Sequence, residues 1–252
     1  EEQLEPYWEA TENPAHVKFI DEEQKFLDNY NNGTKDGVPF KEIYASFEEF
    51  VADWEGIDER DPVMNRYGRY ANPNAKWDWW QTGGRFGGAF KKKGSKRWKD
   101  SVTLGELDLQ GMIQERLEAA NKEYSVLESI LKGRPAPSWG EYLEKYPNVQ
   151  DARNAYNSHP VMQDLNKAQF FVFGGVAEEY GNNREEYLNK VRLGVLVPFA
   201  FVENGIWYEK GQMGWFGMSS NEMPDNEWAE KFHNVLKALP PETVITMVDC
   251  HI

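Results

Sequence analysis

The chain has 252 residues and a net charge of −14, and 14% of its residues are aromatic. This length is enough for one large domain or two small ones with a substantial core. Aromatic side chains bury large areas, so the composition excludes a disordered chain, and the acidic balance argues against a general affinity for nucleic acid.

Cysteine use and hydropathy indicate the compartment. Cys250 is the single cysteine, so an internal disulfide and a CxxC zinc site are both excluded, and an intracellular protein is expected. No run of about 18 apolar residues and no secretory leader is present, so we expect no membrane association. The sequence begins at Glu1 without a methionine, and we expect a native N-terminal strand to be missing.

The N-terminal third is acidic and weakly patterned. A short helix is expected near residues 21–30, ended by the Asn31-Asn32-Gly33 sequence. Ser46 and Glu49 have the spacing of a capping box and predict a helix that ends at Gly56. Residues 57–76 are expected to form a loop.

Residues 77–90 predict a β-hairpin with Gly83-Gly84 as its turn. In that register Trp77 faces Phe90 and Trp79 faces Gly88, and each glycine makes room for a tryptophan. The structural interpretation is a hairpin that covers the core. The functional alternative makes Trp80 a stacking platform beside Arg85 for a base or nucleotide, and a third alternative is a protein contact.

Residues 76–99 form a basic exception to the acidic chain. They hold eight Lys and Arg against Asp78 alone, a net charge of +7, so the rest of the chain carries −21. Cations beside an aromatic ring can bind phosphate and stack a base. The candidate ligand-binding residues here are Lys91, Lys92, Lys93, Lys96, Arg97 and Trp98. The alternatives are a solvated loop, or charges that compensate acidic residues elsewhere in the chain.

Helical and strand signals follow one another in the second half. The longest helix is expected at about 108–132, where apolar residues follow helical spacing up to Gly133. Asn204-Gly205 is the strongest turn signal and predicts a hairpin at about 195–209. The other expected elements are a helix after the Ser138–Glu141 capping box, helices at 149–156, 184–192 and from Pro224 to Pro240, and strands at 170–173, 193–202 and 243–248. Together these predict a single α+β domain over residues 1–252, with an antiparallel or mixed sheet and a C-terminal helix followed by a strand.

Asp249 and His251 lie two residues apart on the expected terminal strand. Alternation would place both side chains on one face and turn Cys250 into the core. A carboxylate and an imidazole can share a proton or bind a metal, but two ligands make no metal site, so we expect neither a metal nor a cofactor. The alternative is a hydrogen-bonded end of the strand.

Catalytic and nucleotide-binding signatures are missing from the sequence. It holds no GxSxG, GxxxxGK[ST], HExxH or GxGxxG motif. The glycine-rich run at 83–88 lies in the expected hairpin and not between a strand and a helix, so it does not predict a phosphate-binding loop.

A family resemblance runs along most of the chain. The motif residues are Asn72-Pro73-Asn74-Ala75-Lys76-Trp77-Asp78-Trp79-Trp80, then Gly83-Gly84-Arg85-Phe86 and Gly88. The motif resembles a stretch of an uncharacterised family of tailed-bacteriophage and prophage proteins, NPNAKWDWY-x-x-GGRW-x-G, with Trp80 and Phe86 in place of Tyr and Trp. Segments 2–7, 106–118, 211–217 and 248–252 are also similar. The resemblance implies a phage origin, a location in the host cytoplasm and an absent first strand, but no activity.

Three hypotheses for the function follow. The first is a non-enzymatic phage accessory protein that binds a host or defence protein, because the chain is acidic and rich in the aromatic residues that anchor interfaces. The second is a nucleotide- or nucleic-acid-binding protein, or an enzyme, that uses Trp80, Arg85 and the basic cluster. The third is a metal-assisted hydrolase built on Asp249 and His251.

Overall fold

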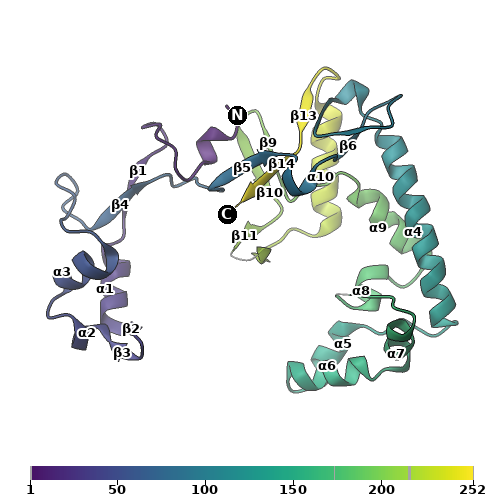
Figure 1. Ribbon diagram of the computed structural model, residues 1–252, viewed down its shortest axis with the longest axis horizontal. Helices are drawn as coiled ribbons and strands as arrows, with labels where there is room; N and C mark the ends of the chain where they lie inside the picture. Colours follow the sequence, from purple (N-terminus) through teal and green to yellow (C-terminus); the bar gives the residue numbers. More distant parts are fainter. Residues whose placement is uncertain (1, 173, 215–216, 252) are drawn as a thin grey trace. The chain divides into compact units, whose positions relative to one another are not determined.

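The computed structural model describes residues 2–172, 174–214 and 217–251, and these residues form an α+β protein (Figure 1). The chain divides into two compact units. Unit 1 comprises Glu1–Gln81, Ala200–Tyr208 and Cys250–Ile252, and unit 2 comprises Thr82–Phe199 and Glu209–Asp249. The sequence predicts one domain, whereas the contacts group the chain into these two units.

Unit 1 contains a helical module at the end of a two-stranded ribbon (Figure 1). The ribbon pairs β1 (Lys18–Asp21) with β4 (Gly68–Ala71) in antiparallel register. The module's other elements are α1 (Glu23–Asn32), β2 (Thr34–Lys35), β3 (Val38–Pro39), α2 (Phe40–Ile43), α3 (Phe47–Phe50) and the π-helical turn η2 (Val51–Glu55). Its core is aromatic and consists of Phe26, Phe40, Tyr44, Phe50, Val51 and Tyr67.

The capping prediction in this module is confirmed. Ser46 Oγ accepts the Glu49 N–H at 3.1 Å, and Glu49 Oε2 accepts the Ala45 N–H at 2.8 Å. Gly56 ends the segment in the left-handed region, with φ of 70°. The expected loop at 57–76 is partly wrong, because β4 lies within it. Its short sequence shows no strong alternation, and it is held by pairing with β1 and by the ion pairs of Arg69 with Glu22 and Glu55.

Unit 1 also contains a 3₁₀ turn near the N-terminus and further strands. They are the 3₁₀ turn η1 (Glu5–Tyr7), most of β5 (Trp79–Thr82), and the hairpin of β9 (Ala200–Glu203) and β10 (Ile206–Glu209). Asn204 and Gly205 have φ of 51° and 75°, as a type I′ turn requires. The hairpin predicted at 195–209 is therefore confirmed, but the strand expected at 193–202 is wrong for its first part. Residues 193–194 belong to α9, residues 195–199 are neither helix nor strand, and the first strand begins at Ala200.

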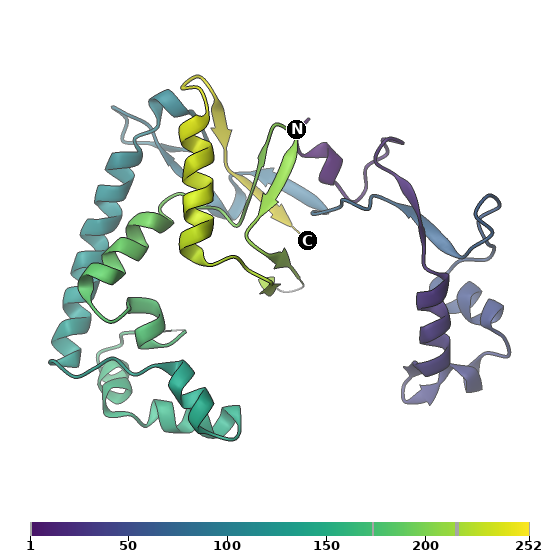
Figure 2. The same ribbon diagram turned by 180° about the vertical axis from the view of Figure 1, so that it is seen from behind.

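Unit 2 is built along the long helix α4 (Leu109–Leu131), which confirms the prediction for 108–132. Asp108 caps it by accepting the Gly111 N–H at 3.0 Å, and Lys132 ends it with φ of 52°. Figures 1 and 2 show α9 (Arg184–Gly194) lying beside α4. The other helices of the unit are α5 (Trp139–Lys145), α6 (Val149–Asn157), α7 (Pro160–Lys167), α8 (Val176–Tyr180) and α10 (Asp225–Ala238).

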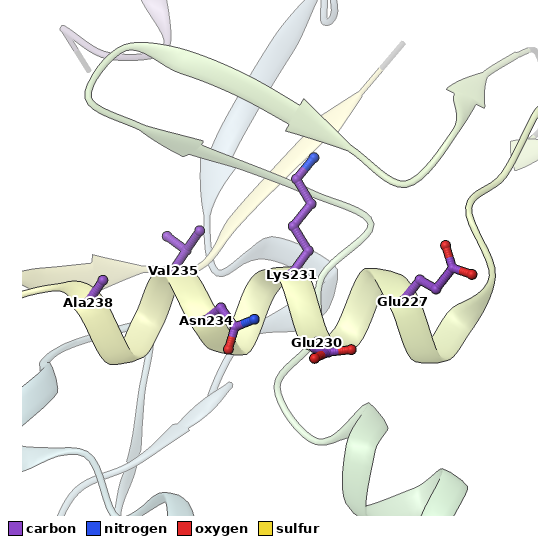
Figure 3. A pocket seen from close by; sticks show the side chains of 6 residues that line it. All are labelled: Glu227, Glu230, Lys231, Asn234, Val235 and Ala238. Atoms are coloured by element: carbon purple, nitrogen blue, oxygen red, sulfur yellow. The ribbon is translucent and has the colours of Figure 1, made fainter.

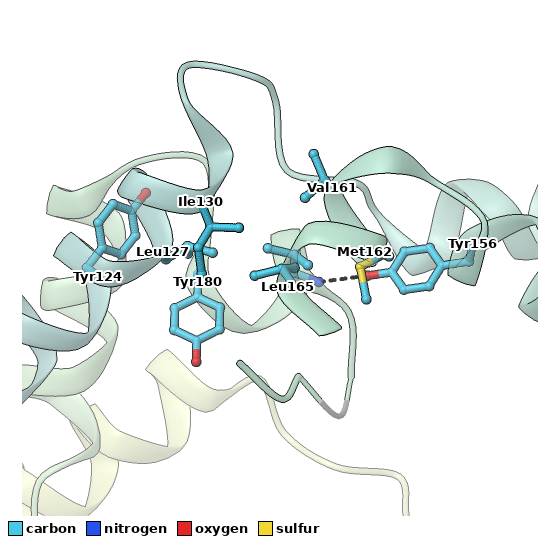
Figure 4. Close-up of a cluster of buried hydrophobic side chains, with 9 residues drawn as sticks. Tyr124, Leu127, Ile130, Tyr156, Val161, Met162, Leu165 and Tyr180 are labelled. Carbon is cyan, nitrogen blue, oxygen red and sulfur yellow. Dashed lines mark hydrogen bonds between the residues drawn. The ribbon is translucent and has the colours of Figure 1, made fainter. Parts of the chain in front are cut away.

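The helices α4 to α9 pack around one core of unit 2, shown in Figure 4. Its buried members are Tyr124, Leu127, Ile130, Tyr156, Val161, Met162, Leu165, Val176 and Tyr180. Tyr156 is tied into this core because its hydroxyl accepts the Val176 N–H at 3.0 Å. The apolar strand expected at 170–173 is wrong for residues 170–172, which contribute Phe170 and Val172 to this core from an irregular segment; residue 173 lies outside the described residues.

Short strands complete unit 2. The strand β6 (Phe90–Lys91) pairs with β7 (Trp98–Lys99), β8 (Ser101–Thr103) pairs with β13 (Val244–Thr246), and β11 (Gln212–Met213) pairs with β12 (Ser219–Ser220). Each of these pairs is antiparallel. The expected terminal strand at 243–248 is divided at Met247 into β13 and β14 (Val248–His251).

The hairpin predicted at 77–90 does not form. Phe90 pairs with Lys99 and not with Trp77, and Trp77 forms an isolated parallel bridge with Trp8. The predicted cross-strand pairs of Trp77 and Phe90 are therefore wrong. The Gly-Gly sequence specifies a turn, but it does not specify which strands the turn joins.

Candidate functional site

The glycine-rich run forms a tight turn in unit 2. Gly83 and Gly84 both have positive φ, of 72° and 52°, but the ψ of Gly83 is −71°, and the chain enters the 3₁₀ turn η3 (Gly84–Phe86). A β-carbon on Gly83 would lie 2.7 Å from Asp100 Cγ, and one on Gly84 would lie 2.5 Å from Asp249 Cβ. Glycine is required at both positions because the turn closes directly onto two carboxylates.

Arg85 and Asp249 form the ion pair at the centre of this turn. The Arg85 backbone N–H donates to Asp249 Oδ2 at 2.8 Å, Nε donates at 2.9 Å, and a terminal guanidinium nitrogen reaches Oδ1 at 2.5 Å. Asp249 is 2% exposed, whereas the Arg85 side chain is 64% exposed. The hydrogen bonds to Asp249 raise the pKa of Arg85. The guanidinium therefore neutralises a buried carboxylate, and part of its hydrogen-bonding capacity is used in that ion pair.

The residues of the terminal strand are not buried in the way that the sequence predicts. Asp249 is the buried residue, and Cys250 is half-buried. Asp249 belongs to unit 2 and His251 to unit 1, and the two side chains have different partners. The expected shared polar site therefore becomes two separate arrangements, one with Arg85 and one with Asp78.

His251 belongs to an exposed group with Asp78 and Trp79. Its Nδ1 lies 3.2 Å from Asp78 Oδ1, and its ring stacks on the Trp79 indole with a centroid distance of 5.2 Å. A protonated Nδ1 that donates to Asp78 leaves Nε2 as an acceptor for a proton or an external ligand. The contacts of the His251 side chain are therefore with a carboxylate and an indole.

The basic segment is only partly available to a ligand. Lys91 pairs with Glu115 at 2.5 Å, Lys92 pairs with Glu106 at 2.6 Å, and Lys93 donates to the Gly105 carbonyl at 2.8 Å. The hydrogen bond to Glu115 raises the pKa of Lys91, and Lys92 lowers the pKa of Glu106. The cations that remain exposed without such a partner are Lys96, Arg97 and Lys99, and Trp98 between them is 42% exposed.

The two other residues predicted for a stacking platform lie in different units. Trp80 is half-buried in β5 of unit 1, and Arg85 is in unit 2. The ring contact that the structure gives to Arg85 is with its own neighbour, Phe86, at 5.7 Å.

Asn72 joins the N-terminal segment to the tryptophan motif within unit 1. It is 5% exposed, and its amide donates to the carbonyls of Pro6 and Trp8 at 2.9 Å each. Trp8 then stacks on Trp77 at 5.9 Å. Segments 2–7 and 72–80 therefore form one local structure.

Acidic charge is concentrated in unit 1. Its residues hold 20 Asp and Glu against 8 Lys and Arg, a net charge of −12, whereas unit 2 holds 22 against 20, a net charge of −2. The arginines of the helical module are bound by its own carboxylates. Arg60, Arg66 and Arg69 pair with carboxylates of the same module.

A shallow depression lies along α10 in unit 2 (Figure 3). Its lining residues are Glu227, Glu230, Lys231, Asn234, Val235 and Ala238. All of them come from one helix, so the feature is open surface and not an enclosed cavity. It does not have the apolar enclosure that is typical of small-molecule sites.

Neither a metal site nor a membrane-spanning helix is found in the described part of the chain. Within it, no three His, Cys, Asp or Glu side chains gather to hold a metal ion. No described helix combines the length and hydropathy needed to cross a bilayer. Comparisons of the chain with models of protein families, with curated proteins and with solved structures found no match.

The partners of Asp78 and Asp100 are not predicted by the sequence. Asp78 binds His251 from 173 positions away in the chain, so no local pattern predicts the pair. Asp100 accepts the Gly88 N–H at 2.6 Å. The only signal for Asp100 is that it closes a run of cations with a single carboxylate.

Proposed function

We propose that the protein is a non-enzymatic binding protein whose acidic unit 1 contacts another protein, a host or defence protein in the phage setting that the resemblance implies. The main observation in support is the net charge of unit 1, which is −12, compared with −2 for unit 2. A charge of one sign on one unit attracts a partner of the opposite sign and speeds its association. The preferred partner is therefore a protein with a basic surface.

Exposed aromatic and apolar side chains in unit 1 support this proposal. Those of unit 1 include Trp54, Val63, Met64, Tyr70 and Trp79. Tryptophan and tyrosine are enriched among the residues that dominate binding energy at interfaces. Unit 1 therefore combines charge for steering with side chains that can anchor a complex.

The contacts of Arg85 and the lysines also favour binding over catalysis. Arg85 neutralises the buried Asp249, and Lys91 and Lys92 pair with carboxylates of their own unit. These residues have structural partners, so they supply little to a reaction centre. Non-enzymatic binding needs no such centre.

The second candidate is nucleic-acid binding at residues 96–99. Its specific support is the exposed Trp98 between Lys96, Arg97 and Lys99. Filter binding of a labelled single-stranded oligonucleotide tests it, and retention should fall steeply with salt if phosphates are bound. No retention at low salt would remove this candidate.

Photo-crosslinking in bacterial cells tests the first proposal. A photoreactive residue replaces Glu59 in unit 1, and a matched variant carries it at Glu118 in unit 2; both positions are exposed. We expect Glu59 to yield one dominant crosslinked protein with a basic surface, and Glu118 not to yield it. Crosslinks to nucleic acid alone, or the same products from both positions, would contradict the proposal.

A further inference from the structure

We infer that the surface around Trp54 in the helical module of unit 1 docks an arginine- or lysine-rich segment of the partner protein. This inference rests on the proposed function and specifies the place and chemistry of binding. We define the Trp54 face as Lys35, Val38, Ile43 and Trp54. All four residues are exposed, and Trp54 is 43% exposed.

The residues of this face are neighbours. The Trp54 ring lies 4.8 Å from that of the buried Phe40, and Lys35 Nζ lies 5.3 Å from the Trp54 centroid. Lys35 pairs with Val38 across the β2–β3 hairpin. Ile43 follows Phe40 by three residues on α2, so the two side chains are neighbours along that helix. Figure 1 shows α2 beside β2 and β3.

The contact of Lys35 with Trp54 shows which ligand suits the face. An ammonium group already lies over an exposed indole, at a distance typical of a cation–π interaction. The structure therefore contains an internal example of the contact that a partner's cation would make. Arginine binds indole faces more effectively than lysine does, because its guanidinium is planar and less strongly hydrated. A partner arginine can therefore displace Lys35.

Surrounding charge favours a cationic ligand and not an acidic one. The module has several exposed carboxylates for which no ion pair is seen, and they include Asp36, Glu42, Asp58 and Glu59. Asp36 forms the turn of the β2–β3 hairpin, and Glu42 precedes Ile43 on α2. Carboxylates beside an apolar, aromatic surface are complementary to a basic peptide that carries apolar side chains.

The backbone near Trp54 is unusual. Residues Val51–Glu55 form a π-helical turn that continues α3 and ends at Gly56. Such turns are rare, and they occur frequently at functional sites because they change the direction of the side chains that follow. In this module the turn keeps Val51 buried while Trp54 stays exposed.

Fluorescence anisotropy with a labelled peptide of alternating arginine and serine tests the inference; the peptide with citrulline in place of arginine is the neutral probe. The full chain is compared with Trp54→Ala, Lys35→Gln and Trp98→Ala, where Trp98 is a matched control because it is 42% exposed in unit 2. We expect Trp54→Ala to weaken binding about tenfold. We expect Lys35→Gln to strengthen peptide binding about threefold, because the substitution removes a competing cation. Trp98→Ala should leave the affinity unchanged. The citrulline peptide should not bind.

The inference would be overturned if the Trp54→Ala and Trp98→Ala proteins bound the peptide with equal affinity. It would also be overturned if Lys35→Gln bound the peptide more weakly, or if the full chain did not bind it. Trp54 packs on Phe40, so Lys35→Gln, a change at an exposed residue, keeps the test valid if Trp54→Ala unfolds the module. Crosslinking from Glu59 separates the two proposals. If Trp54→Ala still gives the same crosslinked protein in cells, the protein-binding function stands and only the assignment of the face fails.

Discussion

Two glycines of similar backbone conformation allow backbone strain to be separated from steric exclusion at single residues. Gly84 has φ of 52° and closes onto Asp249, whereas Gly94 has φ of 69° and nothing within 4 Å of an added β-carbon. We predict that Gly94→Ala destabilises the protein by about 1–2 kcal/mol through positive φ alone. Gly84→Ala should cost roughly 1–3 kcal/mol more because its methyl group overlaps the carboxylate.

Urea unfolding of the two glycine variants, monitored by fluorescence, measures this difference. Both residues lie in unit 2, so both variants report on the same transition. Equal midpoints for Gly84→Ala and Gly94→Ala would show that the turn does not close onto Asp249.

Glu22 and Glu23 give unit 1 a defined dependence on pH. Burial opposes the ionisation of both side chains, but hydrogen bonds outweigh it. Lys25 and Arg69 donate to Glu22 and lower its pKa below 4.5. The Tyr67 N–H and Arg60 donate to Glu23 and lower its pKa below 4.5 as well. A carboxyl whose pKa is lower in the folded state stabilises the fold above its unfolded pKa and loses this effect as the pH falls through the folded pKa.

We therefore predict that the unfolding free energy of unit 1 is steady above about pH 5 and falls as the solution is acidified below about pH 4.5. Glu22→Gln should lower stability at neutral pH and make the remaining pH dependence shallower. Glu42→Gln, at an exposed carboxylate without an ion pair, serves as the control. Urea midpoints measured across this range check the prediction, and an unchanged slope for Glu22→Gln would contradict it.

Between elements, Asn72 is the clamp that holds the N-terminal segment against the tryptophan motif. Asn72→Ala removes both donors to Pro6 and Trp8 and leaves their carbonyls without these partners. We predict a loss of about 1–3 kcal/mol. Hydrogen exchange should accelerate at the Glu9 and Lys76 amides, which donate to Trp77 and Tyr7 across the same contact.

Asn74→Ala is the matched control for the clamp. Asn74 is exposed, and the contact recorded for it is made by its backbone N–H, which the substitution retains. Hydrogen exchange at Glu9 and Lys76 should therefore remain slow. Equal exchange in Asn72→Ala and Asn74→Ala would show that the amide of Asn72 does not hold the segment.

Elements with local signals were predictable from the sequence, and their partners were not. Ser46 specifies its cap within four residues, and Asn204-Gly205 specifies its turn within two, so neighbouring atoms determine both structures. Gly83-Gly84 also requires positive φ, but the turn that follows depends on Asp249, which lies about 165 residues later in the sequence. Long-range contacts of this kind have no periodic signature.

The same limit applies to the candidate sites. The sequence identifies Arg85, His251 and Asp249 as residues that can carry chemistry, but it pairs them differently from the structure. Arg85 binds Asp249, and His251 binds Asp78, because the strand β14 supplies one residue to each unit. The module that contains Trp54 gave only a weak signal, since cation–π contacts depend on tertiary packing.

At the level of the whole molecule, the uneven charge is the property that bears most directly on function. Unit 1 carries −12, whereas in unit 2 the residues Lys96, Arg97 and Lys99 form a short run of exposed cations. The two functional hypotheses therefore assign binding to different units. One measurement can compare them if each charge group is neutralised in turn.

That measurement is the yield of the crosslinked complex in cells for two variants of the full chain, both carrying the photoreactive residue at position 59. One variant replaces Asp36, Glu42 and Asp58 with their amides, and the other replaces Lys96, Arg97 and Lys99 with glutamine. All six are exposed, so folding should be retained. We predict that the first variant loses the crosslinked protein and the second keeps it. Loss in the second variant with retention in the first would contradict it and assign binding to the basic segment.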